Sequence, residues 1–357
     1  MKIHNFSAGP CILPQEVFDR MSQAVLNFNN TGLSLMEISH RHPEAEEVMR
    51  NTIRLTKELL NVPNTHEVIF TQGGASLQFV MVPFNLMREN GGKAAYLDTG
   101  VWASKAIAEA KRMGMTEVVA SSSDKKYSYI PKTYEIPSDA DYFHCTSNNT
   151  VAGTQMKSFP DSPIPIVCDM SSDIMSKEVD ISKFDLIYGG TQKNMGPAGN
   201  AVAIVKKEIL GKTGRNIPTY LNYQTHIDKE STFNTWSVLA VYGAMCNLEW
   251  LKKIGGIPGI SKRNKAKSEL MYAEIDRNGM FAGPVALEDR SDMNATFVLK
   301  DENLKDEFDT MWKAAGIVNL KGHRIVGGYR ASMYNAMPIE SVQVLVDVMK
   351  AFEEKFG

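Results

Sequence analysis

The sequence predicts an α/β fold with a large domain built on a mainly parallel seven-stranded sheet and a smaller α+β domain. Seven short runs of β-forming residues occupy the first two thirds of the chain, with helix-like segments between several of them. Most runs are continuously apolar, which is typical of strands covered on both faces. The 357 residues are also too many for one hydrophobic core.

The large domain is expected to alternate helices and strands. Residues 15–26 carry apolar side chains at helical spacing, and Pro43 begins a longer helix of the same kind. Further helices are expected at 77–87 and 103–112. The strands are expected at seven apolar runs: 68–70, 95–97, 117–119, 142–145, 164–168, 185–188 and 201–205.

A turn-rich segment, Gly255-Gly256-Ile257-Pro258-Gly259, predicts the boundary with the second domain. We therefore expect a large domain over 16–257 and a small domain formed by 1–15 with 258–357. The small domain should contain a basic helix followed by four further elements: a strand at 295–299, a helix around 308–315, a hairpin at 324–334 and an amphipathic helix at 341–356.

Composition excludes several classes of function. The formal net charge of -2 gives no reason to expect a nucleic acid or an anionic membrane as partner. The N-terminus lacks the pattern of a signal peptide, and no apolar stretch reaches the length of a membrane span. Four scattered cysteines without Cys-x-x-Cys spacing indicate reduced thiols, so we expect a cytoplasmic protein.

Ligands of open α/β sheets bind beyond the carboxyl ends of the strands, so the residues after each run are the candidates for chemistry. Gly73-Gly74-Ala75-Ser76 follows one run and precedes a helix. Its small residues would let backbone N–H groups approach a phosphate at the helix N-terminus. Taken alone, this segment fits a simple tight turn better.

Asp169 and Lys193 follow two later runs. A carboxylate at Asp169 would stabilise a protonated pyridine nitrogen, although a helix N-cap or a metal ligand fits this position equally well. Lys193 lies among glycines and neutral residues, where desolvation would make its amine a nucleophile; a buried salt bridge is the alternative. The two residues together favour the cofactor interpretation.

Aromatic and basic residues complete the candidate site. Trp102 follows a strand on the ligand side, where an indole would stack on a flat cofactor, although a tryptophan in a loop more often serves packing. Two basic clusters, His40-Arg41-His42 and Lys321-Gly322-His323-Arg324, would bind an anion, as would Arg330. A surface ion pair is the alternative for each arginine. No metal site is expected, because no acid or cysteine completes a ligand set with the two histidines.

Several long motifs resemble the phosphoserine aminotransferase family, a class V, fold-type-I family dependent on pyridoxal 5′-phosphate. The similarity runs from Phe6 to the last helix. The motifs are Phe6-Ser7-Ala8-Gly9-Pro10, Met36-Glu37-Ile38-Ser39-His40-Arg41, Gln192-Lys193-Asn194-Met195-Gly196-Pro197, Lys321-Gly322-His323-Arg324 and Gly327-Gly328-Tyr329-Arg330-Ala331-Ser332.

The resemblance implies a role for each candidate residue. Lys193 would carry the cofactor as a Schiff base and move the proton, Asp169 would pair with the pyridine nitrogen, and Trp102 would stack on the ring. The remaining cofactor contacts would come from Ala75, Ser76, Thr150 and Gln192, and from Asn234 and Thr235 of a neighbouring subunit. Arg330 would bind the substrate α-carboxylate. Arg41, His323 and Arg324 would bind either the phosphate of phosphoserine or the side-chain carboxylate of glutamate.

The implied reaction transfers an amino group from L-glutamate to 3-phosphohydroxypyruvate, giving O-phospho-L-serine and 2-oxoglutarate in serine biosynthesis. The resemblance also implies a homodimer and allows a second role in vitamin B6 (pyridoxine) biosynthesis. Two alternatives stay open: another class V enzyme, such as an alanine–glyoxylate-type aminotransferase or a cysteine desulfurase, and a binding protein that has lost turnover.

Two positions depart from the family pattern. Ser76 stands where many bacterial members carry an arginine, and Trp236-Ser237 stands where the family usually has two prolines. Two prolines would stiffen the segment that crosses into the neighbouring site. The bulky Trp236 and the flexible Ser237 are therefore expected to shift this loop or to narrow the entrance.

Overall fold

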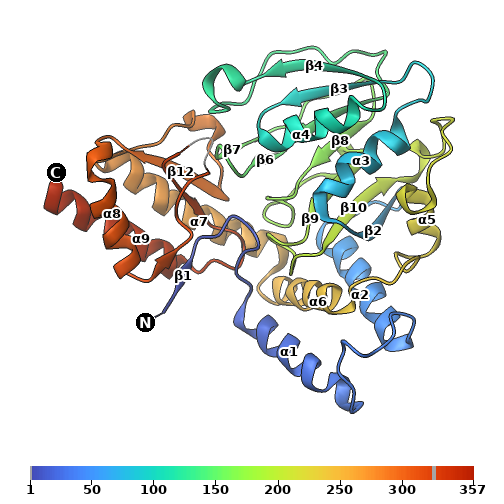
Figure 1. Ribbon diagram of the computed structural model, residues 1–357, viewed down its shortest axis with the longest axis horizontal. Coiled ribbons are helices and arrows are strands. Elements are labelled where there is room, and N and C mark those ends of the chain that lie inside the picture. The colour runs from blue at the N-terminus through green and yellow to red at the C-terminus, as the bar shows by residue number, and fades with distance from the viewer. Residues whose placement is uncertain (1, 324–326) are drawn as a thin grey trace.

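The seven predicted runs form one sheet in the computed structural model, which describes residues 2–323 and 327–357 (Figure 1). The strand order is β2-β10-β9-β8-β5-β3-β4. Only β10 runs antiparallel to its neighbours in this sheet, so the mainly parallel prediction is confirmed. The strands are β2 (His66–Gln72), β3 (Lys93–Asp98), β4 (Met115–Ser121), β5 (Tyr142–Thr146), β8 (Ile166–Asp169), β9 (Leu186–Gly190) and β10 (Asn200–Lys206).

Helices cover both faces of this sheet because successive strand residues point to opposite sides. Val68 and Phe70 of β2 join a core with α1, α2 and α6, whereas Ile69 between them joins a core with α3, α4 and α5. These helices are α1 (Gln15–Leu26), α2 (Pro43–Leu59), α3 (Gly74–Leu86), α4 (Val101–Ala110), α5 (Tyr223–Asp228) and α6 (Val238–Lys253).

Strand β4 is the exception to coverage on both faces. It lies at the edge of the sheet and leaves Met115 and Val118 exposed. The expectation of buried strands is therefore wrong for β4, because the helices that cover the other strands leave part of this one accessible to solvent.

The small domain packs three helices against a three-stranded antiparallel sheet, with the order β11-β12-β14. Its core contains a cluster of aromatic rings that includes Phe281, Phe297, Phe308 and Phe352. The elements are α7 (Gly256–Arg277), α8 (Lys305–Ala314), α9 (Ile339–Phe356), β11 (Phe281–Ala282), β12 (Asn294–Leu299) and β14 (Tyr329–Ser332).

Two expectations for this domain change in detail. The predicted turn at 255–259 is only a break between α6 and α7, at Gly255 and Gly256, whose φ angles are 103° and 64°. Such positive values suit glycine. The predicted hairpin at 324–334 begins in residues outside the described part, and β14 pairs with β12.

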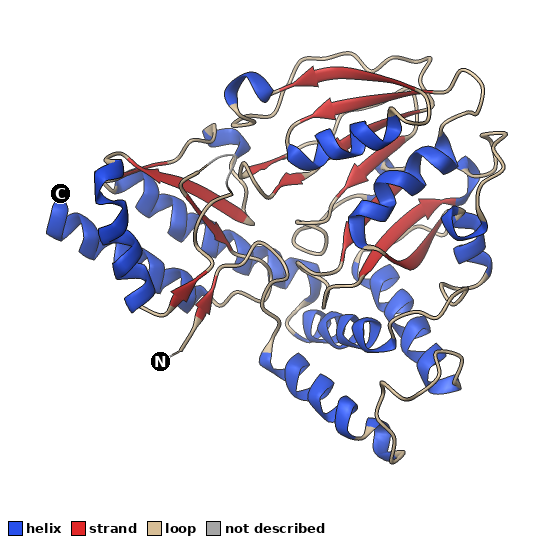
Figure 2. Cartoon of the chain, in the orientation of Figure 1, coloured by secondary structure: helices blue, strands red, loops and turns tan. Residues whose placement is uncertain are grey.

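The N-terminal segment reaches the small domain through a pairing that is distant in sequence. Strand β1 (His4–Asn5) runs parallel to β13 (Ile317–Val318) (Figure 2). The next residue, Phe6, is buried in the small-domain core. The remaining described strands, β6 (Asn148–Asn149) and β7 (Thr154–Gln155), form a separate small ribbon. The domain limits given above stay a proposal, with which these contacts agree.

Among the described residues, no helix has the length and apolar character needed to span a membrane.

Candidate active site

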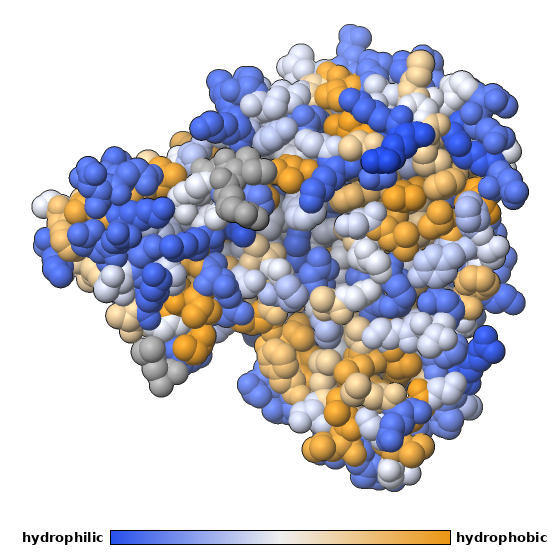
Figure 3. Space-filling view, in the orientation of Figure 1, coloured by the Kyte–Doolittle hydropathy of each residue, from blue (hydrophilic) through white to orange (hydrophobic). Residues whose placement is uncertain are grey.

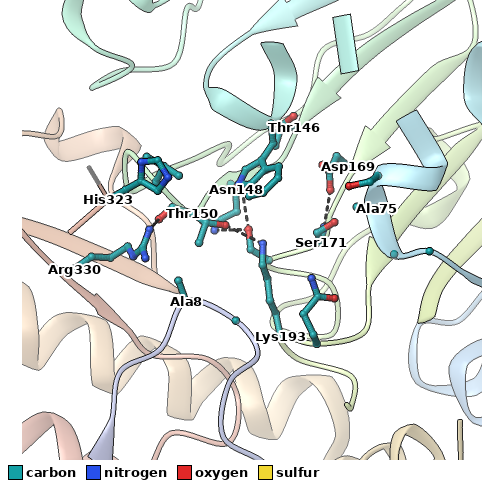
Figure 4. A pocket seen from close by; sticks show the side chains of 18 residues that line it. Ala8, Ala75, Thr146, Asn148, Thr150, Asp169, Ser171, Lys193, His323 and Arg330 are labelled. Carbon is teal, nitrogen blue, oxygen red and sulfur yellow. Dashed lines mark hydrogen bonds between the residues drawn. The ribbon is translucent and has the colours of Figure 1, made fainter. Parts of the chain in front are cut away.

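A cavity of about 360 Å³ lies at the carboxyl ends of β5, β8 and β9, where this part of the sheet meets the N-terminal segment and the small domain. Figure 4 shows its side chains pointing inward from segments far apart in sequence. Its lining comprises Ala8, Gly9, Gly73, Gly74, Ala75, Ser76, Trp102, Thr146, Asn148, Thr150, Val151, Asp169, Ser171, Ser172, Gln192, Lys193, His323 and Arg330.

Asp169 is the last residue of β8, and only 3% of its surface is exposed. Its Oδ1 accepts a hydrogen bond of 2.9 Å from the backbone N–H of Ser171. Burial raises the pKa of the Asp169 carboxyl, and the hydrogen bonds from Ser171 and the charge of Lys193 oppose that rise. A cation bound beside Asp169 would therefore find a carboxylate that gains from pairing.

Lys193 lies in the loop between β9 and β10 and is 8% exposed. Its Nζ donates to Oγ1 of Thr150 over 3.0 Å. Burial lowers the pKa of Lys193 to about 8; the charge of Asp169 acts against this, and that of Arg330 reinforces it. Lys193 and Asp169, which were predicted to lie close together, both line this one cavity (Figure 4).

Trp102 forms part of the cavity wall from the first turn of α4. The Nζ atom of Lys193 lies 5.8 Å from the centroid of its ring. The indole therefore stands beside the amine, where a flat ring attached to Lys193 would meet an aromatic surface.

The predicted phosphate segment connects β2 to α3. Gly73 and Gly74 have φ angles of 85° and 59°, so a side chain at either position would be strained. This turn places Ala75 and Ser76 in the first turn of α3 on the cavity wall. The free N–H groups and partial positive charge of a helix N-terminus suit a phosphate.

Two basic residues, Arg330 and His323, lie on the opposite side of the cavity from Asp169 (Figure 4). Arg330 comes from β14, and its Nη1 donates to the backbone oxygen of Thr150 over 3.2 Å. His323 lies on the same wall. Arg324, which is predicted to act with them, lies outside the described residues.

Three predicted residues do not line the cavity of their own chain. Arg41 lies in an exposed turn before α2, and Asn234 and Thr235 lie in the segment before α6. The neighbouring Trp236 is 3% exposed and packs in the large core. The expected effect of Trp236 and Ser237 concerns the site of a neighbouring subunit, so it stays a prediction.

Several lining residues were missed as site residues, among them Ala8 and Gly9, although a sequence motif contains these two. Ala8 and Gly9 belong to the segment after β1, which the pairing of β1 with β13 carries to the cavity. A Cβ atom on Gly9 would lie 3.5 Å from Cγ of Lys193, so this glycine sits directly against the lysine stem. No local sequence pattern predicts this contact.

The residues present fit pyridoxal 5′-phosphate. The cavity offers a buried amine for an aldehyde, a buried carboxylate for a ring nitrogen, an indole for the ring and a helix N-terminus for the phosphate. Its volume is within the range of small-molecule sites.

Comparisons with known proteins agree with this chemistry. The model of the family "Aminotransferase class-V" matches residues 3–345. A phosphoserine aminotransferase of Flavobacterium psychrophilum is 62% identical over 99% of this chain and 100% of its own. The solved phosphoserine aminotransferase of Bacillus circulans subsp. alkalophilus is 42% identical, with a TM-score of 0.96 over 100% of this chain and 99% of its own.

A further solved relative is the PLP-bound phosphoserine aminotransferase of Trichomonas vaginalis. It is 33% identical, with a TM-score of 0.92 over 98% of this chain and 100% of its own. Fold, cavity and full-length similarity lead to one assignment. The chain belongs to the class V aminotransferase family.

Proposed function

We propose that this chain transfers the amino group of L-glutamate to 3-phosphohydroxypyruvate, giving O-phospho-L-serine and 2-oxoglutarate for serine biosynthesis. Pyridoxal 5′-phosphate is its cofactor. The observation that carries the proposal is that Lys193, Asp169 and Arg330 line one cavity. Full-length relatives named phosphoserine aminotransferase, at up to 62% identity, support the choice of substrate.

The cofactor supplies an electron-withdrawing ring that stabilises negative charge at the substrate Cα. Asp169 would keep the ring nitrogen protonated, and the Lys193 amine would move the proton to and from the Cα atom. Trp102 would hold the plane of the ring. Ala75, Ser76 and Gln192 would bind the phosphate, and the hydroxyl of Thr150 would bond the ring side.

Both amino-acid substrates carry an α-carboxylate and a second anion. The planar guanidinium of Arg330 suits the shared α-carboxylate. His323 and Arg324, together with Arg41, would bind the second anion, either a phosphate or a side-chain carboxylate. One cationic wall would thus serve two substrates in turn.

The substrate assignment is tested by half-reactions of the cofactor-loaded protein with single amino acids. We expect L-phosphoserine and L-glutamate to change the cofactor spectrum far faster than L-alanine. A faster reaction with L-alanine would instead favour an alanine–glyoxylate-type enzyme. A protein that stays colourless after incubation with cofactor would favour a binding protein without turnover.

Replacing Arg330 with alanine is expected to lower kcat/KM for both amino-acid substrates by about 10- to 100-fold, because a charge-assisted bond to the α-carboxylate is lost. Steady-state kinetics with each substrate measures the effect. Arg112→Ala is the matched control, since the side chain of Arg112 is 74% exposed. Equal kinetics for the two variants would show that Arg330 does not bind the α-carboxylate.

The lowered pKa of Lys193 predicts how cofactor attachment depends on pH. Only the neutral amine attacks an aldehyde. With a pKa of about 8, half of the Lys193 side chains are neutral near pH 8. The rate of reconstitution, followed by absorbance, should rise from pH 7 to about 9 and then level off. A rate still climbing above about pH 10 would indicate an ordinary lysine.

A homodimer would explain the three predicted residues that lie away from the cavity. Large apolar side chains are exposed on α1 and in the segment after it, namely Phe18, Leu26, Leu33 and Met36. Figure 3 shows apolar side chains gathered over the end of the molecule that α1 occupies, at the bottom of the view. Such a patch is typical of a protein interface. Arg41, Asn234 and Thr235 would then complete the site of the partner.

Mixed dimers test this arrangement. Arg41→Ala and Lys193→Ala chains should each be weakly active or inactive alone, whereas dimers reassembled from both should recover partial activity, because one of the two sites is then intact. The absence of recovery in proven mixed dimers would place Arg41 in the site of its own chain.

A cytoplasmic location stays a prediction from the sequence.

A further inference from the structure

Helix α7 holds a chain segment that follows the Arg330 strand. Nζ of Lys267 donates to the backbone oxygens of Met333 and Tyr334, over 2.9 and 2.7 Å. One turn earlier on the same face, Nδ2 of Asn264 donates to Oδ1 of Asn335 over 2.8 Å. The two α7 side chains therefore grip three consecutive residues, which begin directly after β14.

The gripped segment is also joined to the Lys193 loop. The backbone N–H of Asn335 donates to Oδ1 of Asn194, the residue next to Lys193, over 3.0 Å. Nδ2 of Asn194 in turn donates to the backbone oxygen of Ile174 over 3.1 Å.

The chain that follows Asp169 is the third member of this network. Asn264 donates to the backbone oxygen of Ser176, and Asn335 donates to that of Met175, over 3.1 and 2.9 Å. Three asparagines thus join the segments that follow Asp169, Lys193 and Arg330. On the far side of the gripped segment, the hydroxyl of Tyr334 donates to the backbone oxygen of Ala8 on the cavity wall.

This network is buried and away from the reacting groups. Asn194, Asn264, Lys267 and Asn335 are between 1% and 4% exposed, and neither α7 side chain lines the cavity. Among the described residues, no carboxylate acts on the pKa of Lys267, and burial lowers the pKa of its amine to about 7. Buried hydrogen bonds of this kind fix geometry, because a broken one leaves a polar group without water.

We propose that Asn264 and Lys267 are positioning residues that set the placement of the Arg330 guanidinium relative to the Lys193 amine. The inference rests on the proposed function, in which Arg330 binds the α-carboxylate and Lys193 acts at the neighbouring Cα atom. If Arg330 is displaced, the α-carboxylate that it binds moves too, and the substrate Cα atom no longer lies where the Lys193 amine can reach its proton. A displacement of about 1 Å can lower the rate about 100-fold.

The variant Lys267→Met keeps an unbranched side chain, one heavy atom shorter, and removes both hydrogen bonds. Lys265→Met is the matched control, because Lys265 lies on the same helix with 75% of its side chain exposed. We expect Lys267→Met to lower kcat/KM for L-glutamate and L-phosphoserine by a similar factor of about ten or more, because both share the α-carboxylate. The preference between the two substrates and the cofactor absorbance should stay unchanged.

A binding measurement separates positioning from a general loss of stability. Glutarate, which has two carboxylates and no amine to react, should bind the cofactor-loaded Lys267→Met variant about tenfold more weakly in calorimetry, well below its melting temperature. Control-like glutarate binding and kinetics in folded Lys267→Met would overturn the proposal. So would a loss confined to phosphoserine, since that would indicate the pocket for the second anion.

The variant Asn264→Ser decides the matter if Lys267→Met does not fold. Serine removes the hydrogen bonds that the side-chain amide donates to Asn335 and Ser176 but keeps a small polar group. We expect kcat/KM to fall by a similar factor for both substrates. Unchanged kinetics in folded Asn264→Ser would contradict the proposal. Failure of the proposed function would look different, because the unmodified protein itself would then convert neither phosphoserine nor glutamate.

Discussion

Replacing Lys193 with alanine is expected to reduce turnover by about a thousandfold or more, because no amine remains to move the proton at the substrate Cα. The geometry explains why no other group substitutes. Lys193 is buried, bonded to Thr150, and lies on the wall between the carboxylate of Asp169 and the guanidinium of Arg330 (Figure 4). Single-turnover spectra with L-glutamate measure the loss.

Lys183→Ala is the control for this variant, since Lys183 is an exposed lysine on the same domain. A small primary amine added to Lys193→Ala should restore part of the activity, because it can occupy the space of the missing side chain and carry the proton. Near-normal turnover of Lys193→Ala without added amine would refute the role given to this lysine.

Asp169→Asn should cause the second largest loss, about 100-fold or more in the half-reaction with either amino acid. Asparagine keeps the shape, and its Oδ1 still accepts from the N–H of Ser171, so the local fold should survive. What disappears is the negative charge that would keep a ring nitrogen protonated. Asp161→Asn, at an exposed position, is the matched control.

Cofactor binding gives a second readout for Asp169→Asn. The variant should bind pyridoxal 5′-phosphate more weakly and show an altered absorbance, because a cation would lie in a buried place without its counter-charge. A rate and a spectrum equal to those of Asp161→Asn would mean that Asp169 does not contact the ring nitrogen.

Much of the fold follows from local pattern. The helix predicted from the period of Val17, Met21 and Val25 has the limits Gln15–Leu26 in the structure. All seven apolar runs became strands of one sheet, because an extended run satisfies its backbone hydrogen-bonding groups by pairing with neighbouring strands. The exposed edge strand β4 shows the limit of this reasoning, since its run does not reveal that the helices leave part of it uncovered.

The candidate site was predictable where it follows the ends of strands. Asp169, Thr150 and Lys193 come together because parallel strands end at one edge of the sheet. Ala8 and Gly9 reach the cavity through the pairing of β1 with β13, more than 300 residues apart, which no local pattern encodes. Residues that act from another chain, as proposed for Arg41, lie beyond any inference from one chain's geometry.

The central claim is that Lys193 holds the cofactor opposite Asp169, and one chemical experiment tests it most directly. The protein is loaded with pyridoxal 5′-phosphate, reduced with borohydride, digested and mapped by mass spectrometry. We predict that the reduced cofactor is attached to Lys193. A label on a different lysine, or no label on a protein that has bound the cofactor, would contradict the account.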